Sequence, residues 1–141
     1  IWLRRLPQGP AWIVFLLAVT WLGETAAYLV GSRMGRHKLA PVISPAKTIE
    51  GAVAQAIVSV AVGGLAFGLL FPGRAVGLGL AAGLLLGVLG QFGDLAESVL
   101  KRSAHTKDTG GVIPGHGGLL DRLDSLLLNT PALFYYARYM G

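Results

Sequence analysis

The chain has 141 residues, of which 53% are hydrophobic and only 13% are charged, and its formal net charge is +5. Soluble domains carry roughly 25% charged residues, so this deficit indicates a membrane protein rather than a soluble one. The 141 residues include no cysteine, which excludes disulfides and thiolate metal sites within them. The basic residues lie in loops between apolar segments, which favours an anionic lipid surface or a phosphate-bearing substrate over nucleic acid.

Four apolar segments are candidate membrane-spanning helices, at residues 11–31, 52–71, 75–96 and 126–141. The first three each approach or exceed the roughly 20 residues that a helix needs to cross a bilayer. The last is expected to be interrupted or kinked at Pro131. We therefore predict an all-α, polytopic integral membrane protein, with a bundle of transmembrane helices in one membrane-embedded domain over residues 1–141. Because the first residue is Ile1 rather than Met, we expect the chain to be a fragment of a longer protein.

The loops between these segments predict the orientation in the membrane. If each segment spans once, residues 32–51 and 98–124 lie on one side, together with eight bases: Arg33, Arg36, Lys38, Lys47, Lys101, Arg102, Lys107 and Arg122. The other side holds Arg4, Arg5 and Arg74. The side richer in bases is the cytoplasmic one, so we expect a multi-pass protein of the cell membrane whose polar site faces the cytoplasm.

The carboxylates are expected on or near the same side of the membrane as these bases. Glu24 lies inside the first apolar segment, and Asp94 lies near the matching end of the third. A carboxylate at such a depth is costly unless it is paired, protonated or bound to a metal, so both residues are candidates for a functional site. The alternative for Glu24 is an interfacial carboxylate that reaches water.

Further carboxylates share helix faces. Asp94, Glu97, Ser98 and Lys101 are spaced so that they lie on one face of a helix, and Asp121 and Asp124 also share a face. Two helices that bring such carboxylates together would make an oxygen-rich site for a hard cation such as Mg²⁺. The alternative is ion pairing on a helix surface, for example between Glu97 and Lys101.

The bases and glycines of residues 98–124 suit a phosphate. Lys101, Arg102, Lys107 and Arg122, together with Lys47, would bind an anion strongly, although positive charge that merely orients the protein is the alternative. Glycines such as Gly117 and Gly118 allow close approach of the backbone to a phosphate, and His116 could contact one. The two standard nucleotide-binding fingerprints are absent from the sequence. The combination favours phosphoryl or nucleotidyl transfer at a membrane surface.

One stretch resembles the sequence pattern of the phosphatidate cytidylyltransferase (CDP-diacylglycerol synthase) family. The matching positions are Ser98, Leu100, Lys101, Arg102, Lys107, Asp108, Gly110, Ile113, Pro114, His116, Gly117, Gly118, Leu119, Asp121, Arg122, Leu123 and Asp124. Residues 38–51 and 90–98 also look like this family. One departure concerns residues 24–28, which read Glu-Thr-Ala-Ala-Tyr where the family usually has Asp-Thr-Gly-Ala-Tyr. The chain would then be the C-terminal catalytic part of such an enzyme.

The resemblance implies an activity. CTP and phosphatidic acid would give CDP-diacylglycerol and pyrophosphate. Mg²⁺ would be required, and a second, monovalent cation such as K⁺ is a further candidate cofactor. Metal ligands would come from Asp94, Asp121, Asp124 and Glu24, and the catalytic groups would be Asp94, Asp121, Lys101 and Lys107. The substrate-binding residues would be Lys47, Ser98, Arg102, His116, Gly117, Gly118 and Arg122.

Other readings stay open at this point. A related CTP-using membrane enzyme could act on another lipid, as an ether-lipid cytidylyltransferase or a polyprenol kinase does. A membrane transporter would also carry intramembrane carboxylates and glycine-rich helices. Besides CTP, phosphatidic acid and the lipid bilayer, a second copy of the chain is a further candidate partner, in a homodimer.

Overall fold

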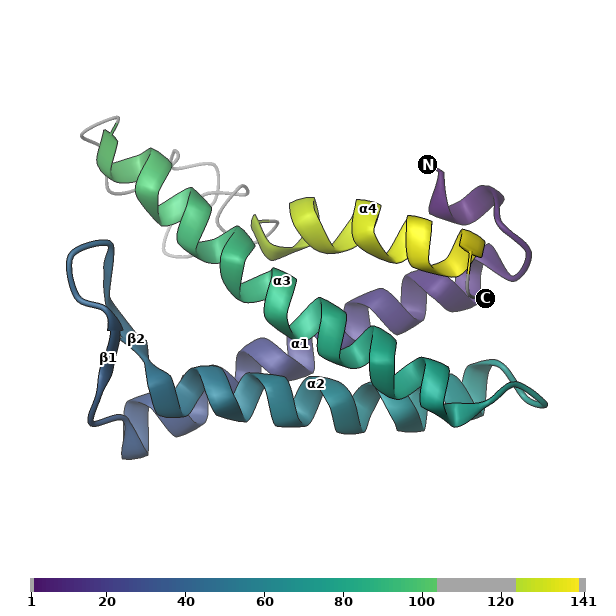
Figure 1. The fold of residues 1–141 in the computed structure, drawn as a ribbon, viewed down its shortest axis with the longest axis horizontal. Coiled ribbons are helices and arrows are strands. Elements are labelled where there is room, and N and C mark those ends of the chain that lie inside the picture. The colour runs from purple at the N-terminus through teal and green to yellow at the C-terminus, as the bar shows by residue number, and fades with distance from the viewer. Residues whose placement is uncertain (1, 104–123, 140–141) are drawn as a thin grey trace, which may run out of the picture.

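The computed structural model describes residues 2–103 and 124–139, and for Lys101, Arg102 and Asp124 it describes the backbone only. In chain order it contains a short 3-10 helix η1 (Leu3–Arg5), helix α1 (Gly9–Met34), strands β1 (Lys38–Ala40) and β2 (Ser44–Thr48), and helices α2 (Ile49–Leu70), α3 (Val76–Ser103) and α4 (Asp124–Tyr139). Figure 1 shows α1 and α2 side by side, with α3 crossing them. Helix α4 packs against α3 and also lies beside the N-terminal half of α1.

The described part of the chain is mostly helical, and three of its helices are long and apolar enough to cross a membrane: α1, α2 and residues 76–100 of α3. This confirms the predicted all-α membrane fold class. At about 1.5 Å per residue, the 22 residues of α2 span about 33 Å, which is close to the hydrocarbon thickness of a bilayer. Helix α4 has 16 residues and continues through Pro131. The chain is therefore an integral membrane protein by the length and composition of its helices.

The loop predicted at residues 32–51 contains a small β-hairpin. Strand β1 pairs antiparallel with β2, with Lys38 opposite Thr48 and Ala40 opposite Ser44. Helix α2 starts directly after β2, because Thr48 is its N-cap and the Thr48 hydroxyl accepts a hydrogen bond of 3.2 Å from the backbone N–H of Gly51. The hairpin is therefore attached rigidly to the end of a membrane helix.

A contact between His37 and Glu50 closes the base of this hairpin. The backbone N–H of His37 donates to the Glu50 carboxylate at 3.2 Å, and His37 Nδ1 lies 2.7 Å from Glu50 Oε1. The His37 carbonyl in turn accepts from the backbone N–H of Ile49 at 2.9 Å. The His37 side chain is exposed, but it helps to join the hairpin to α2.

Glycines let α2 and α3 approach closely. A Cβ atom at Gly63 of α2 would lie 2.5 Å from the Gly79 carbonyl oxygen and 2.8 Å from the Gly83 Cα of α3. Real Cβ atoms do not come this near to backbone atoms, so only glycine fits at this crossing. Inside a bilayer the hydrophobic effect does not drive helices together. Small residues at a crossing let the backbones come close enough for van der Waals packing to do so.

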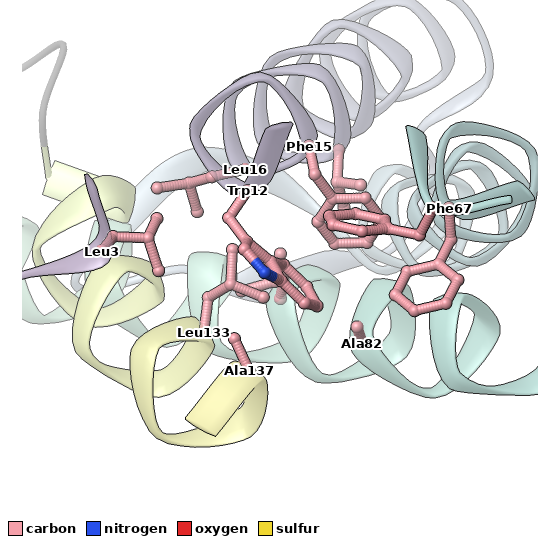
Figure 2. Packing of buried hydrophobic residues seen from close by; sticks show 11 residues of the cluster. Leu3, Trp12, Phe15, Leu16, Phe67, Ala82, Leu133 and Ala137 are labelled. Carbon is pink, nitrogen blue, oxygen red and sulfur yellow. The ribbon is translucent and has the colours of Figure 1, made fainter. Parts of the chain in front are cut away.

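Aromatic side chains form the apolar core at the end of α1 and α2 that lies away from the hairpin. The rings of Trp12 and Phe71 have centroids 4.4 Å apart, and those of Phe15 and Phe67 are 6.0 Å apart. Figure 2 shows Leu133 and Ala137 of α4 packed next to Trp12 of α1. This aromatic core holds α1, α2 and α4 together, and the opposite end of the bundle is left for polar groups.

Candidate functional site

A pocket of about 320 Å³ opens at the hairpin end of the bundle. Its walls come from α1, the hairpin, the first turns of α2 and the C-terminal half of α3. The lining residues are Glu24, Ala27, Tyr28, Gly31, Ser32, Leu39, Ala46, Lys47, Thr48, Gly51, Ala52, Gln55, Gln91 and Asp94. Segments that are up to 70 positions apart in the sequence thus meet in one cavity.

An ion pair crosses the pocket. Lys47 Nζ of β2 lies 2.6 Å from Asp94 Oδ2 of α3, and the two side chains are 20% and 43% exposed. The hairpin and the C-terminal half of α3 therefore lie at the same end of the molecule, as Figure 1 also shows. Partial burial makes this pair less screened than a surface pair, yet both groups remain open to a ligand.

Glu24 of α1 is the second carboxylate of the pocket. Its Oε1 accepts a hydrogen bond from the hydroxyl of Ser125, which is the second residue of α4. One turn away in each helix, Asn129 Nδ2 donates to Thr20 Oγ1 at 3.1 Å. The carboxylate of Glu24 is therefore held from the side of α4, while Lys47 and Asp94 approach the pocket from the other walls.

Two glutamines complete the polar lining. Gln91 Nε2 of α3 donates to the carbonyl oxygen of Ala52 at 2.7 Å, which ties α3 to the first turns of α2. Gln55 is only 7% exposed and also lines the pocket. Sequence reasoning assigned no role to these two residues, to Ser125 or to Asn129. The available signal was a polar side chain within an apolar segment, because such residues usually hydrogen-bond across helices in membranes.

The structure brings three of the predicted site residues together: Glu24, Lys47 and Asp94. Ser98 lies one turn beyond Asp94, where its hydroxyl donates to the Asp94 carbonyl oxygen at 2.9 Å and does not line the pocket. For Lys101, Arg102 and Asp124 only the helical backbone is described. Outside the described residues lie the remaining predicted positions: Lys107, His116, Gly117, Gly118, Asp121 and Arg122.

The described carboxylates are too few to enclose a divalent cation by themselves, but they could supply some of its ligands. Among the residues that the structure describes, no group of three or more histidine or acidic side chains is close enough to hold a metal ion. Glu24 and Asp94 nevertheless share one pocket. Because Mg²⁺ keeps several waters and is commonly bound by one or two carboxylates plus substrate phosphates, this donor set fits it.

Comparison with known proteins identifies the class. Residues 1–140 match the model of the cytidylyltransferase family, so the chain belongs to that family. The predicted resemblance to this family is therefore confirmed.

Individual relatives are similar to the chain over most of its length. The chain is 43% identical to uncharacterized protein YnbB of Escherichia coli K12, over 98% of the chain and 48% of that protein. It is 44% identical to a protein named phosphatidate cytidylyltransferase from Staphylococcus saprophyticus, and 43% identical to one of that name from Staphylococcus aureus strain COL. Each of these two matches covers 89% of the chain and 48% of the relative. The chain thus spans about half the length of the curated relatives it matches.

Proposed function

We propose that this chain forms the catalytic region of a magnesium-dependent phosphatidate cytidylyltransferase of phospholipid biosynthesis. The enzyme transfers CMP from CTP to phosphatidic acid and releases pyrophosphate. The observation that carries the proposal is the pocket in which Lys47, Asp94 and Glu24 meet at one end of three membrane helices. Family membership and relatives that bear this enzyme name support the choice of reaction.

The location of the pocket suits a lipid substrate and a water-soluble nucleotide. It lies at the ends of α1 and α2, beside the polar hairpin, and Tyr28 on its rim is 74% exposed. Acyl chains can stay in the bilayer while the phosphate headgroup enters the pocket, and CTP can arrive from water. The excess of bases predicted for this end supports a pocket that faces the cytoplasm, where CTP is available.

The chemistry needs charge neutralisation more than a base. The phosphate monoester of phosphatidic acid has a second pKa of about 6 and is largely ionised at neutral pH. One of its oxygens attacks the α-phosphorus of CTP, a new P–O bond forms, and the bond to the bridging oxygen breaks so that pyrophosphate leaves with the electron pair. No proton has to be removed from the nucleophile, which agrees with a pocket that has no catalytic triad among its described residues.

The residues of the pocket can perform this neutralisation. Lys47 offers three N–H donors, so it can bind a phosphate oxygen when a cation takes its place at Asp94. Asp94 and Glu24 would hold Mg²⁺, together with Asp121 and Asp124 as the family pattern suggests, and a second, monovalent cation such as K⁺ belongs to the same proposal. When bound, Mg²⁺ supplies Lewis-acid stabilisation of the charge on the α-phosphate and the leaving group. The bases predicted to bind phosphate within residues 98–124 would add further positive charge to that of Lys47.

The position of the label in CTP tests the reaction type. Full-length protein in detergent is given phosphatidic acid, Mg²⁺ and CTP labelled at either the α- or the γ-phosphate. Cytidylyl transfer puts the α-label into lipid and leaves the γ-label in pyrophosphate, whereas a lipid kinase puts the γ-label into lipid. The same assay with an ether-lipid phosphate or a polyprenol as acceptor separates the related enzymes. If neither label enters any of these lipids, the proposed function is wrong.

A matched pair of lysine variants links activity to the pocket. Lys47→Gln removes the charge on β2 that contacts Asp94, and Lys38→Gln removes an exposed charge on the neighbouring strand. We expect the first to lower turnover strongly and the second to leave it nearly unchanged. Equal activity of the two variants would mean that the pocket is not the site of the reaction.

A further inference from the structure

Two polar contacts join α1 to α4 on consecutive helical turns. Ser125 donates to Glu24, and Asn129 donates to Thr20. Residues 20 and 24 are one turn apart on α1, and 125 and 129 are one turn apart on α4, so the contacts are successive rungs between antiparallel helices. We name these four residues, Thr20, Glu24, Ser125 and Asn129, the α1–α4 ladder.

The ladder is shielded from solvent. Thr20 is 3% exposed, Ser125 is 1% exposed and Asn129 is fully buried. The Asn129 amide also lies close to α3, where the lack of a side chain at Gly90 leaves room for it: a Cβ atom there would lie only 3.1 Å from Asn129 Nδ2. A polar side chain in such surroundings depends on protein partners for its hydrogen bonds, so its position is tied to theirs.

The same register continues into the apolar part of the bundle. Counted in the same spacing, the next positions toward the aromatic end are Leu16 and Leu133, and after another turn Trp12 and Ala137. All four belong to the buried apolar cluster, and Figure 2 shows them on facing sides of α1 and α4. The two helices therefore present polar residues to polar residues near the pocket and apolar residues to apolar residues beyond it.

A shift of α4 by one turn would break this match in either direction. One shift places the buried amide of Asn129 against Leu16, and the other places Leu133 against Thr20. Each leaves a polar group without its partner in a region of low dielectric constant, which is unfavourable. Single buried asparagines set the register of coiled coils in the same way.

We propose that Asn129 fixes the register of α4 on α1, and that Ser125 uses this register to orient the carboxylate of Glu24 in the pocket. Both are positioning residues, since Asn129 acts through Thr20 and Ser125 acts through Glu24. The effect on catalysis rests on the proposed function, but the register itself does not.

Distances between spin labels test the register without any assay of activity. The labels are attached to cysteines introduced at Leu29 of α1 and Tyr139 of α4, which are 41% and 74% exposed, in full-length protein cleared of any other cysteine. The two positions lie far apart along a pair of antiparallel helices, so much of the distance between them runs along the helix axes. In Asn129→Leu, we expect α4 to slide along α1 by about 5 Å, the rise of one helical turn, so that the label distance shifts by several ångströms or its distribution broadens. The exchange Thr20→Asn with Asn129→Thr keeps one amide and one hydroxyl in the rung and should restore the original distance.

Two results would overturn the register. One is an unchanged distance in Asn129→Leu, and the other is an exchange variant that shifts as much as Asn129→Leu does. If Asn129→Leu does not fold, the milder Thr20→Val removes the same rung from the α1 side and carries the same expectation.

Activity tests the role of Ser125. With CTP and phosphatidic acid as substrates, we expect Ser125→Ala to lower kcat/KM about tenfold, the scale of one interhelical hydrogen bond in a membrane. Ser125→Thr keeps the hydroxyl and should retain most of the kcat/KM of the unmodified protein. In a Glu24→Asp variant, where the side chain is one methylene shorter, adding Ser125→Ala should lower kcat/KM only slightly further. An equal loss in both backgrounds would show that Ser125 does not act through Glu24. If the unmodified protein has no activity, the proposed function and the role of Ser125 both fail, while the label distances still decide the register.

Discussion

The two ends of the helix bundle are built on different principles. At one end, Trp12, Phe15, Phe67 and Phe71 pack ring against ring and need no partner from outside the chain. At the other end, Glu24, Lys47 and Asp94 line a cavity and keep their charges partly open. The first arrangement stabilises the fold through contact area, whereas the second holds polar groups where they can exchange their partners for a ligand. Changes at the aromatic end should therefore affect stability, and changes at the polar end should affect activity.

The largest expected effect is loss of activity in Asp94→Asn. The amide keeps the shape of the side chain but removes the negative charge that contacts Lys47 and that is proposed to bind Mg²⁺. We expect kcat to fall by about 10³-fold, the scale for removing one key electrostatic group from an active site. Thermal unfolding in detergent should change little. An activity within a few fold of the unmodified protein would remove Asp94 from the catalytic site.

Phe67→Ala tests the opposite end. Phe67 is fully buried and contacts Trp12, Phe15 and Phe71 through its ring. Its removal should lower the free energy of unfolding by about 3 kcal/mol, as for other large-to-small changes at buried aromatic positions. The fraction that stays folded should keep its kcat. A normal melting temperature combined with lost activity would contradict the division between the two ends.

Gly63→Leu sharpens the comparison in the middle of the bundle. The added side chain has no room between α2 and α3, because even a Cβ atom would lie 2.8 Å from the Gly83 Cα. We expect α3 to move away from α2, with loss of both stability and activity, because α3 carries Asp94. Gly77→Leu on α3 is the control, since within the described part of the chain nothing beyond its own stretch of helix lies within 4 Å of a Cβ built there. Thermal unfolding and turnover of the two variants are compared in the same detergent.

The smallest expected effect comes from Glu50→Gln, which weakens the contact of Glu50 with His37 at the base of the hairpin. Because this contact is exposed, its loss should leave the fold intact. The hairpin would then hold Lys47 less firmly, and we expect KM for CTP to rise about two- to threefold with kcat nearly unchanged, as for a lost binding contact. Steady-state kinetics at several CTP concentrations provide the measurement.

The helices could be predicted from sequence because each apolar run is long enough to span a bilayer. Glu24 and Asp94 could also be singled out from sequence, since a carboxylate at that depth is costly unless it has a partner, and the structure brings both into one pocket. Their meeting with Lys47 in one pocket was not predictable from spacing alone, because it depends on how α3 crosses α2. The hairpin was missed as well, since Pro41 and Pro45 and its mixed residues read as an irregular loop.

The contacts of α4 were the least accessible to sequence reasoning. Ser125 and Asn129 look like ordinary polar residues of a helix start until Glu24 and Thr20 are seen opposite them. Pattern arguments give the face of one helix, but the register between two helices is set by pairs of residues about 100 positions apart. Only a three-dimensional structure supplies that information.

The Lys47–Asp94 ion pair has a consequence for the order in which ligands can bind. Each partner already satisfies the charge of the other across 2.6 Å. A lone cation at Asp94 would sit next to a lysine of like charge, and a lone phosphate at Lys47 would sit next to a carboxylate of like charge. A cation that arrives together with a phosphate replaces one ion pair by two, without leaving a charge uncompensated. The pocket should therefore discriminate against either ion alone and favour the nucleotide that arrives with its metal already bound.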